Sequence, residues 1–270
     1  MLMNEMPAFD AIAAEYDKSF SDSLIGWEQR QLSRHWLKKI LPSQKKLEIL
    51  EINCGTGDDA LWLGSLGHTV IATDQSTAMI ERAEKKLSLI DQKNVRFISC
   101  SFENLANQFG REQFDLIFSN FSGLNCVSPN EMTGLSKELV SLLKKNGHLA
   151  VVVFGKYSWW ETFFFLLKAR PDKAFRRWSN KDVKAMLAEN VYQPVYYYSI
   201  RHLKKMLSSL RLVEKRPVGL FIPPTYLEAA MKKRPSLFQS LTKLEKNMNG
   251  LPASSSFADH VYLLFKKEQA

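Results

Sequence analysis

An apolar run that ends in a glycine-containing loop is the part of this sequence best suited to chemistry. The run EILEI (residues 48–52) leads into the loop NCGTG (residues 53–57), and Asp58 and Asp59 follow at once. A tight glycine turn between a buried strand and a helix brings backbone N–H groups close to a ligand, as in many nucleotide sites. The sequence therefore predicts that a nucleotide-containing ligand binds at this loop.

One interpretation of the loop is a dinucleotide site. Gly55, Gly57 and Ala60 match the fingerprint G-x-G-x-x-A. Asp74 lies close to the position where that fingerprint places a ribose contact. A single match of this kind is weak evidence, so a nicotinamide dinucleotide stays open as one alternative.

The charges around the loop favour a cationic ligand instead. A pyrophosphate there would face Glu51, Asp58 and Asp59, with no Lys or Arg nearby in the sequence to offset them. At an effective dielectric constant of about 20, two like unit charges about 4 Å apart repel by roughly 4 kcal/mol. S-adenosylmethionine carries an ammonium and a sulfonium group, and also a ribose for Asp74. We therefore expect this cofactor.

Apolar runs and helical stretches alternate along the first part of the chain. Two helices are expected first, within residues 6–20 and at about 22–40. The alternation then predicts an α/β fold with a parallel sheet covered by helices on both faces. The expected strands are 47–52, 69–73, 95–99, 114–119 and 148–154, and the expected helices lie near 57–66, 76–89 and 131–145, the last one ended by Asn146-Gly147.

The alternation breaks after Phe154, which divides the chain into three parts. Residues 1–154 should contain N-terminal helices and the cofactor-binding core. Residues 155–198 are aromatic and basic and are expected to form an inserted helical cap. Residues 199–270 should complete the core. In this last part we expect a helix at 199–209, strands at 211–219 and 259–267, and a helical insert at 225–247.

The composition is that of a soluble globular protein, with 45% hydrophobic and 24% charged residues. No run approaches the roughly 18 apolar residues that a membrane span needs, and the N-terminus lacks the features of a signal peptide. Cys54, Cys100 and Cys126 lack metal-ligand spacing, so we expect a reduced, cytoplasmic setting and no bound metal.

The net charge of +9 is concentrated in the second half of the chain. Residues 1–150 carry 16 Lys and Arg against 19 Asp and Glu, whereas residues 151–270 carry 21 against 9. The first half is therefore −3 and the second +12. Such asymmetry suggests contact with an acidic partner or an anionic surface. A solvated basic face without a partner fits equally well.

Five successive motifs resemble those of class I S-adenosylmethionine-dependent methyltransferases. They are LEILEINCGTG, VIATDQSTAMIERA, FISCSFENL, FDLIFSNFSGLN and LLKKNGHLAVVVF. The opening FDAIAAEYDKSF and the closing ADHVYLLFKK are similar to those of members that act on small molecules. The resemblance covers nearly the whole chain except the cap. It implies a Rossmann-like sheet of seven mostly parallel strands, with the cap inserted, and S-adenosylmethionine as the cofactor.

The resemblance also implies roles for the matching positions. Glu51 and the backbone of the loop would hold the methionine end, and Asp74 would accept hydrogen bonds from both ribose hydroxyls. Side chains of the second and third motifs would surround the adenine. The residues that end the strand at 114–119 would border the methyl group. The implied cofactor contacts are Tyr16, Glu51, Asn53, Cys54, Gly55, Gly57, Asp74, Gln75, Met79, Ser101, Phe102, Ser119 and Asn120.

Two positions depart from the family pattern. Asn53 stands where the family usually has glycine, but asparagine tolerates positive φ better than most residues. Ser101 stands where an aspartate commonly accepts a hydrogen bond from the adenine amine, and an uncharged hydroxyl forms a weaker bond. Both changes predict a reduced affinity for the cofactor.

A general base is needed only if the acceptor must lose a proton. The candidates are Tyr16, His202 and one of Tyr196, Tyr197 and Tyr198, of which at least one should face the cleft. Among these tyrosines we choose Tyr197. The remaining histidines are expected to be structural; they are His35, His68, His148 and His260.

The segment 155–198 carries the main clue to the acceptor. Five aromatic side chains crowd residues 159–165, and six Lys and Arg follow between 170 and 184. We expect a hydrophobic small molecule, free, anionic or bound to an acidic carrier, with O-methylation favoured. A peripheral membrane contact is a further possibility. DNA is not expected. RNA methylation, or cofactor binding without catalysis, stays open as an alternative, although no RNA-binding module is recognised.

Overall fold

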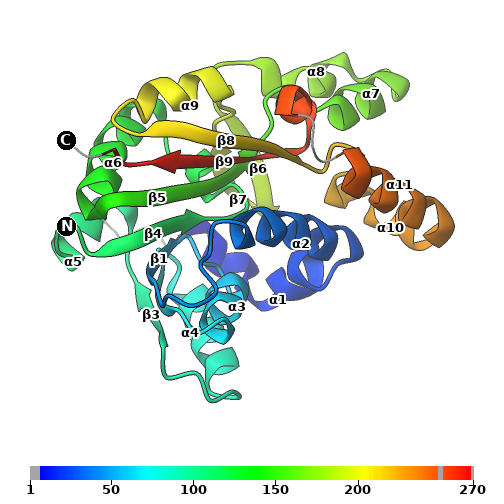
Figure 1. Cartoon of the computed structure of the whole chain (residues 1–270). Helices are drawn as coiled ribbons and strands as arrows, with labels where there is room; N and C mark the ends of the chain where they lie inside the picture. Colours follow the sequence, from blue (N-terminus) through cyan, green and yellow to red (C-terminus); the bar gives the residue numbers. More distant parts are fainter. Residues whose placement is uncertain (1–6, 249–251, 269–270) are drawn as a thin grey trace.

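A seven-stranded sheet organises the chain (Figure 1). The computed structural model describes residues 7–248 and 252–268, and the strand order of the sheet is β3-β2-β1-β4-β5-β9-β8. Strands β1 to β5 run parallel, whereas β9 runs antiparallel between β5 and β8. The strands are β1 Glu48–Ile52, β2 Thr69–Asp74, β3 Val95–Ser99, β4 Phe114–Ser119, β5 Leu143–Phe154, β8 Arg211–Val218 and β9 His260–Lys266. This confirms the predicted Rossmann-like α/β fold.

Helices cover both faces of the sheet, which explains why its central strands are apolar on both sides. Leu50 of β1 and Ile117 of β4 belong to one buried cluster, and their neighbours Ile49 and Leu116 belong to the other. The helices of the first face are α2 Leu24–Lys38, α3 Asp58–Ser65, α4 Thr77–Leu87, α10 Glu228–Lys232 and α11 Pro235–Met248. Those of the second are α5 Leu105–Gln108, α6 Pro129–Leu142 and α9 Ile200–Met206.

The N-terminal segment is less regular than the single helix expected there. A 3₁₀ helix (Ala8–Ile12), the short α1 (Ala13–Tyr16) and a π-helical turn (Asp17–Ser21) lead into α2. Within residues 7–248 and 252–268, no helix is long and apolar enough to cross a membrane.

The segment 155–198 is only partly helical, which corrects the prediction of a helical cap. It begins with α7 (Trp159–Leu167) and α8 (Pro171–Ala174), but β6 (Val183–Ala188) and β7 (Val191–Val195) then form an antiparallel hairpin. Its tightest point is Asn190, whose φ of 59° suits the left-handed region that hairpin turns require. The hairpin contacts the N-terminal 3₁₀ helix, so the two elements face each other across one edge of the sheet.

The helix expected at 131–145 ends earlier than predicted. α6 stops at Leu142, and β5 begins at the next residue. Asn146 has a φ of 62° and lies where the pairing of β4 with β5 shifts register, between Leu143 and His148. The Asn-Gly pair is therefore a turn within an irregular strand, not the stop of a helix.

Glu245 ties α11 to the loop that follows β8. Its carboxylate is almost fully buried and accepts hydrogen bonds from four consecutive backbone N–H groups, of residues 219–222, at 2.5–3.2 Å. Burial raises the pKa of Glu245, and the four donors oppose that rise. Because no other acceptor among residues 7–248 and 252–268 is bonded to these N–H groups, the loop depends on this side chain.

Glu245→Ala is expected to lower the free energy of unfolding by about 3 kcal/mol, because it leaves buried N–H groups unpaired. Glu245→Gln, which keeps one carbonyl oxygen as an acceptor, should lower the free energy of unfolding by less. Urea denaturation followed by circular dichroism measures both values. Glu84→Ala on the exposed face of α4 is the control, and an equal small loss in all three variants would contradict the assignment.

Candidate active site

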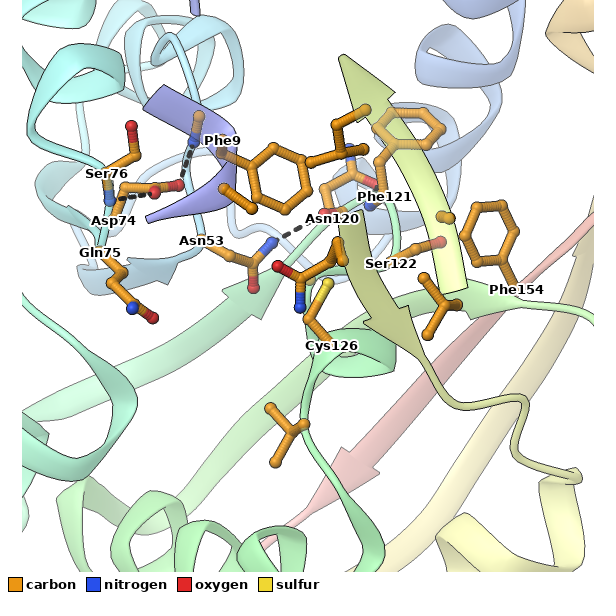
Figure 2. Close-up of a pocket in the computed structure, with 18 of the residues that line it drawn as sticks. Phe9, Asn53, Asp74, Gln75, Ser76, Asn120, Phe121, Ser122, Cys126 and Phe154 are labelled. Atoms are coloured by element: carbon orange, nitrogen blue, oxygen red, sulfur yellow. Dashed lines mark hydrogen bonds between the residues drawn. The ribbon is translucent and has the colours of Figure 1, made fainter. Parts of the chain in front are cut away.

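A cavity of about 1030 Å³ lies at the carboxyl edge of the parallel strands. Residues that follow β1, β2 and β4 line it, among them Asn53, Asp74 and Asn120, which Figure 2 shows around a common space. Phe9 of the N-terminal segment and Val195 of the hairpin line it from the opposite side. The cavity occupies the place where open α/β sheets bind their ligands.

The glycine loop has the tight turn that the sequence predicts. Gly55 lines the cavity with a φ of 55°, and Gly57 begins α3 with a φ of 83°. A Cβ on Gly57 would lie 2.6 Å from the ring of Phe97, so this glycine is required by packing. Gly57 does not line the cavity, whereas Cys54 does.

Asp74 holds the loop and also faces the cavity. Its Oδ2 accepts a hydrogen bond from the N–H of Gly55 at 2.8 Å, and its Oδ1 accepts one from the N–H of Ser76 at 2.9 Å (Figure 2). Burial raises the pKa of Asp74, and these backbone donors partly offset the rise. Each carboxylate oxygen keeps acceptor capacity for a ligand hydroxyl.

Asn53 links the ends of β1 and β4. Its Oδ1 accepts a hydrogen bond from the hydroxyl of Ser119 at 2.6 Å. Its Nδ2 donates to the carbonyl of Asn120 at 2.9 Å (Figure 2). Asn53 has a φ of 52°, and its side chain occupies the space where a Cβ on Gly123 would sit. Asparagine thus tolerates the turn, as predicted, and adds two hydrogen bonds that a glycine could not form.

Ser119 does not reach the cavity, although the sequence predicted a cofactor contact. Its side chain is fully buried and bonded to Asn53. Ser101 is likewise absent from the cavity wall, since its hydroxyl accepts a hydrogen bond from Asn104 at 3.1 Å on the surface. The other adenine-side residues line the cavity as a group; they are Gln75, Met79 and Phe102.

The acidic residues after the loop are compensated, which corrects the electrostatic argument from the sequence. Asp59 forms ion pairs with Arg30 at 3.0 Å and with Arg34 at 2.6 Å, and Asp58 pairs with Lys86 at 2.7 Å. All three cations come from other helices and are distant in the sequence. The premise of unopposed carboxylates is therefore wrong for both aspartates.

The N-terminal segment covers the loop. Thr56 donates a hydrogen bond to Asp17 at 2.5 Å, and Ser76 donates one to Asp10. The ring of Tyr16 lies against Gly55, 3.7 Å from the position of a Cβ there. Burial raises the pKa of Tyr16, so its hydroxyl is poorly suited to act as a base near neutral pH.

The other two predicted bases also fail to fit that role. Tyr197 lines the cavity, which confirms that one tyrosine of the three faces it, but burial raises its pKa. Tyr198 packs in the core and donates to the carbonyl of Val127 at 2.5 Å. His202 lies on the exposed face of α9 and is not part of the cavity wall, so its prediction as a base is not supported by the geometry.

His260 lines the cavity, although the sequence analysis assigned it a structural role. Its ring stacks on Phe154 with centroids 4.7 Å apart, and it meets the edge of Phe121 at 5.5 Å. Its Nδ1 lies 3.2 Å from Oδ2 of Asp259. The orientation of β9 explains the error: because this strand is antiparallel, its first residue lies at the carboxyl edge of the others.

A buried charge cluster supports His260. Asp259 Oδ1 pairs with Arg177 at 2.9 Å, and Arg177 also pairs with Glu161 at 2.8 Å. Burial alone would raise the pKa of Asp259, but Arg177 and His260 hold it well below its usual range. Arg176 forms a further bond to Glu161 at 2.7 Å and lines the cavity. Asp259 is thus ionised and fixed beside the imidazole.

The family of the central region is given by comparison with known proteins. The family model described as a methyltransferase domain matches residues 49–147. A solved S-adenosylmethionine-dependent methyltransferase from Methanosarcina mazei superposes with a TM-score of 0.61 at 18% identity, over 87% of this chain and 98% of that one. Residues 49–147 therefore match a methyltransferase domain, and the fold is that of S-adenosylmethionine-dependent methyltransferases of known structure.

Two curated relatives are 30% identical to the chain over part of its length. A tRNA/tmRNA (uracil-C(5))-methyltransferase of Campylobacter jejuni matches over 122 residues, 43% of this chain and 34% of that protein. A demethylmenaquinone methyltransferase of Lactococcus lactis matches over 150 residues, 53% of this chain and 56% of that protein. The chain thus spans from a third to about half of their lengths, and their names describe unlike acceptors.

Glu51 is a buried carboxylate in the cavity wall. Its side chain is 2% exposed and lines the cavity, and its Oε2 has no hydrogen-bond partner among the described residues. Burial, followed by the charge of Asp59, raises the pKa of Glu51 well above its usual value. A buried carboxylate without a full set of partners is stabilised by a ligand ammonium group.

Binding of S-adenosylmethionine is therefore expected to release a proton from Glu51. The raised pKa keeps the carboxyl protonated above its usual range, and the incoming cation favours the ionised form, so affinity should increase with pH across that window. Calorimetric titration in phosphate and in Tris buffer measures the proton release from the difference in enthalpy. Glu51→Gln should abolish the release and weaken binding by roughly 10- to 100-fold. Equal enthalpies in both buffers for the unchanged protein would contradict this assignment.

Proposed function

We propose that this protein transfers the methyl group of S-adenosylmethionine to a hydrophobic small molecule, with oxygen as the accepting atom. The main support is that one cavity includes both the glycine loop with Asp74 and the wall that carries His260. Cofactor and acceptor can therefore meet in a space lined largely by apolar groups, as displacement at a sulfonium requires.

The cofactor end of the cavity is assigned by side-chain chemistry. Asp74 accepts the ribose hydroxyls, and Glu51 accepts the ammonium group. Tyr16 and the N-terminal segment cover this end, which excludes water. The adenine side is formed by Gln75, Met79 and Phe102.

The acceptor end lies below α7, where Phe154, Tyr197 and Tyr226 line the cavity. These rings favour an apolar or aromatic acceptor. Arg176 is the cation of this wall whose side chain is partly exposed, at 36%. It can bind an anionic substituent of the acceptor, in keeping with the acidic or carrier-bound acceptors considered from the sequence.

His260 is proposed as the general base. Its Nδ1 lies 3.2 Å from the carboxylate of Asp259, so Nε2 is the nitrogen proposed to take the acceptor's proton. S-adenosylmethionine supplies an electrophilic methyl carbon, whose bond to sulfur breaks as the acceptor oxygen bonds to it, leaving S-adenosylhomocysteine. Phe154 stacks on the imidazole, Phe121 contacts it at nearly a right angle, and Arg177 holds Asp259.

The cofactor assignment is tested by calorimetric titration with S-adenosylmethionine, S-adenosylhomocysteine and NAD. Both adenosyl ligands should bind, NAD should not, and Asp74→Ala should weaken binding at least 10-fold because two charge-assisted hydrogen bonds are lost. Asp91→Ala, at an exposed position, is the matched control. Tight NAD binding would refute the proposal.

The acceptor class is tested by methyl transfer to a panel of phenols, hydrophobic carboxylic acids and bulk RNA. Turnover of RNA alone would overturn the small-molecule assignment and favour the alternative of RNA methylation. Adenosyl binding without turnover of any acceptor would favour a protein that binds the cofactor but does not catalyse.

His260→Gln is expected to lower kcat by roughly 10²- to 10⁴-fold, the usual contribution of a general base, with little change in cofactor affinity. Added imidazole should partly restore the activity of His260→Ala. His202→Gln is the matched control, since this histidine is exposed on α9. Unchanged kcat in His260→Gln, with S-adenosylmethionine still bound, would remove His260 from the mechanism.

A further inference from the structure

The α7–α8 hairpin has an apolar outer face. Phe163, Leu166 and Leu167 lie on one side of α7, at the i, i+3, i+4 spacing of a helical stripe, and are 55%, 46% and 72% exposed. Phe175 and Trp178, which follow α8, are also exposed. We call these five side chains the outer apolar face. The rings of Phe175 and Trp178 touch, with centroids 5.2 Å apart, and α7 and α8 pack against each other, so the exposed apolar groups belong to one small unit of the fold.

The inner face of the same helix is fully occupied. Phe164 packs on Tyr226 with ring centroids 5.1 Å apart, and Glu161 binds Arg176 and Arg177. The hairpin therefore already has a packed side toward the cavity. Its outer face is an additional apolar surface that the core of the fold does not use.

The segment that carries the outer apolar face is also basic. Between residues 163 and 184 the exposed charged groups are five Lys and Arg against two Asp. Lys168 directly follows Leu167 in the sequence, and the ammonium groups of Lys168 and Lys173 lie over the rings of Phe164 and Phe165 of the same hairpin. The other exposed charges of this region are Arg170, Lys181, Lys184, Asp172 and Asp182.

We propose that the outer apolar face docks on the surface of a membrane that contains anionic phospholipids. Aromatic and leucine side chains beside lysines suit the boundary between acyl chains and head groups. There the apolar side chains are buried among acyl chains, and the lysines are attracted to the anionic head groups. The excess of positive charge matches the negative surface of such a bilayer and not a neutral one. An acidic protein would also match the positive charge. The five exposed apolar side chains favour the bilayer instead, because they can enter its acyl region.

This position would bring a lipid-dissolved acceptor close to the cavity. Tyr226 and Arg176 line the cavity and pack against the inner face of the hairpin. An acceptor leaving the bilayer beside α7 would therefore enter at the acceptor end. This last step rests on the proposed function, whereas the membrane contact does not.

The test is flotation of the purified protein with vesicles of phosphatidylcholine alone or mixed with phosphatidylglycerol, without cofactor or acceptor. The protein should float only with the mixed vesicles, and less at high salt, because charge attraction to the surface is screened. Phe163→Ser/Leu166→Ser/Leu167→Ser and Lys168→Glu/Lys173→Glu should each reduce the bound fraction at least 10-fold, because both apolar and electrostatic contributions are needed for stable binding.

The matched controls lie elsewhere on the surface. Leu89→Ser/Ile90→Ser replaces two side chains that are 80% and 44% exposed at the end of α4, and Lys137→Glu/Lys145→Glu changes two exposed lysines. Both should bind vesicles like the unchanged protein. Binding of S-adenosylmethionine checks that the hairpin variants are folded; if that ligand fails to bind even the unchanged protein, near-UV circular dichroism serves instead.

Three results would overturn the proposal. One is an absence of binding to mixed vesicles. Another is binding that the hairpin variants leave unchanged while either control reduces it. The third is a dimer in sedimentation that dissociates when Phe163, Leu166 and Leu167 are replaced, since a second copy of the chain would then cover the face.

Discussion

The ion pairs of Asp59 fix the geometry on which the site depends. This carboxylate is 2% exposed and is bonded by Arg30 and Arg34 of α2, and also by the side-chain amide of Asn120 after β4. Helix α2 and the residue after β4 are therefore both bound to the first turn of α3. A buried charge tolerates the loss of a partner poorly, so the covering helix, the glycine loop and the end of β4 are held as one unit.

The regular part of the fold was accessible from the sequence because its signals are local. The strands 95–99 and 114–119 have the predicted bounds, since each apolar run is closed by polar residues. The hairpin at 183–195 was missed because the residues of its first strand, Lys184 to Ala188, are all good helix formers. The partners of Asp58 and Asp59 were missed because Arg30 and Arg34 lie on another helix, and sequence proximity does not measure distance across a fold.

The two ends of the cavity differ in how far the sequence reveals them. The cofactor end consists of residues at or just after the ends of parallel strands, so motif spacing finds most of them. Ser101 and Ser119 fail because their hydroxyls bond to Asn104 and Asn53. The acceptor end combines the end of β5, the segment after it and the start of β9. Phe154 and His260 are paired across two antiparallel strands, and no local pattern connects them.

The place of β9 in the sheet has a consequence for how the chain reaches its native state. β8 joins the sheet only through β9, because β9 pairs with β5 on one side and β8 on the other. Until β9 docks, β5 presents an unpaired edge that contains Val151, Val152 and Val153, and such edges recruit other chains. Pairing across so long a stretch of sequence is slow. At high protein concentration, the fraction of chains that fold rather than aggregate therefore depends on how fast β9 pairs with β5. It depends less on the stability of the finished sheet.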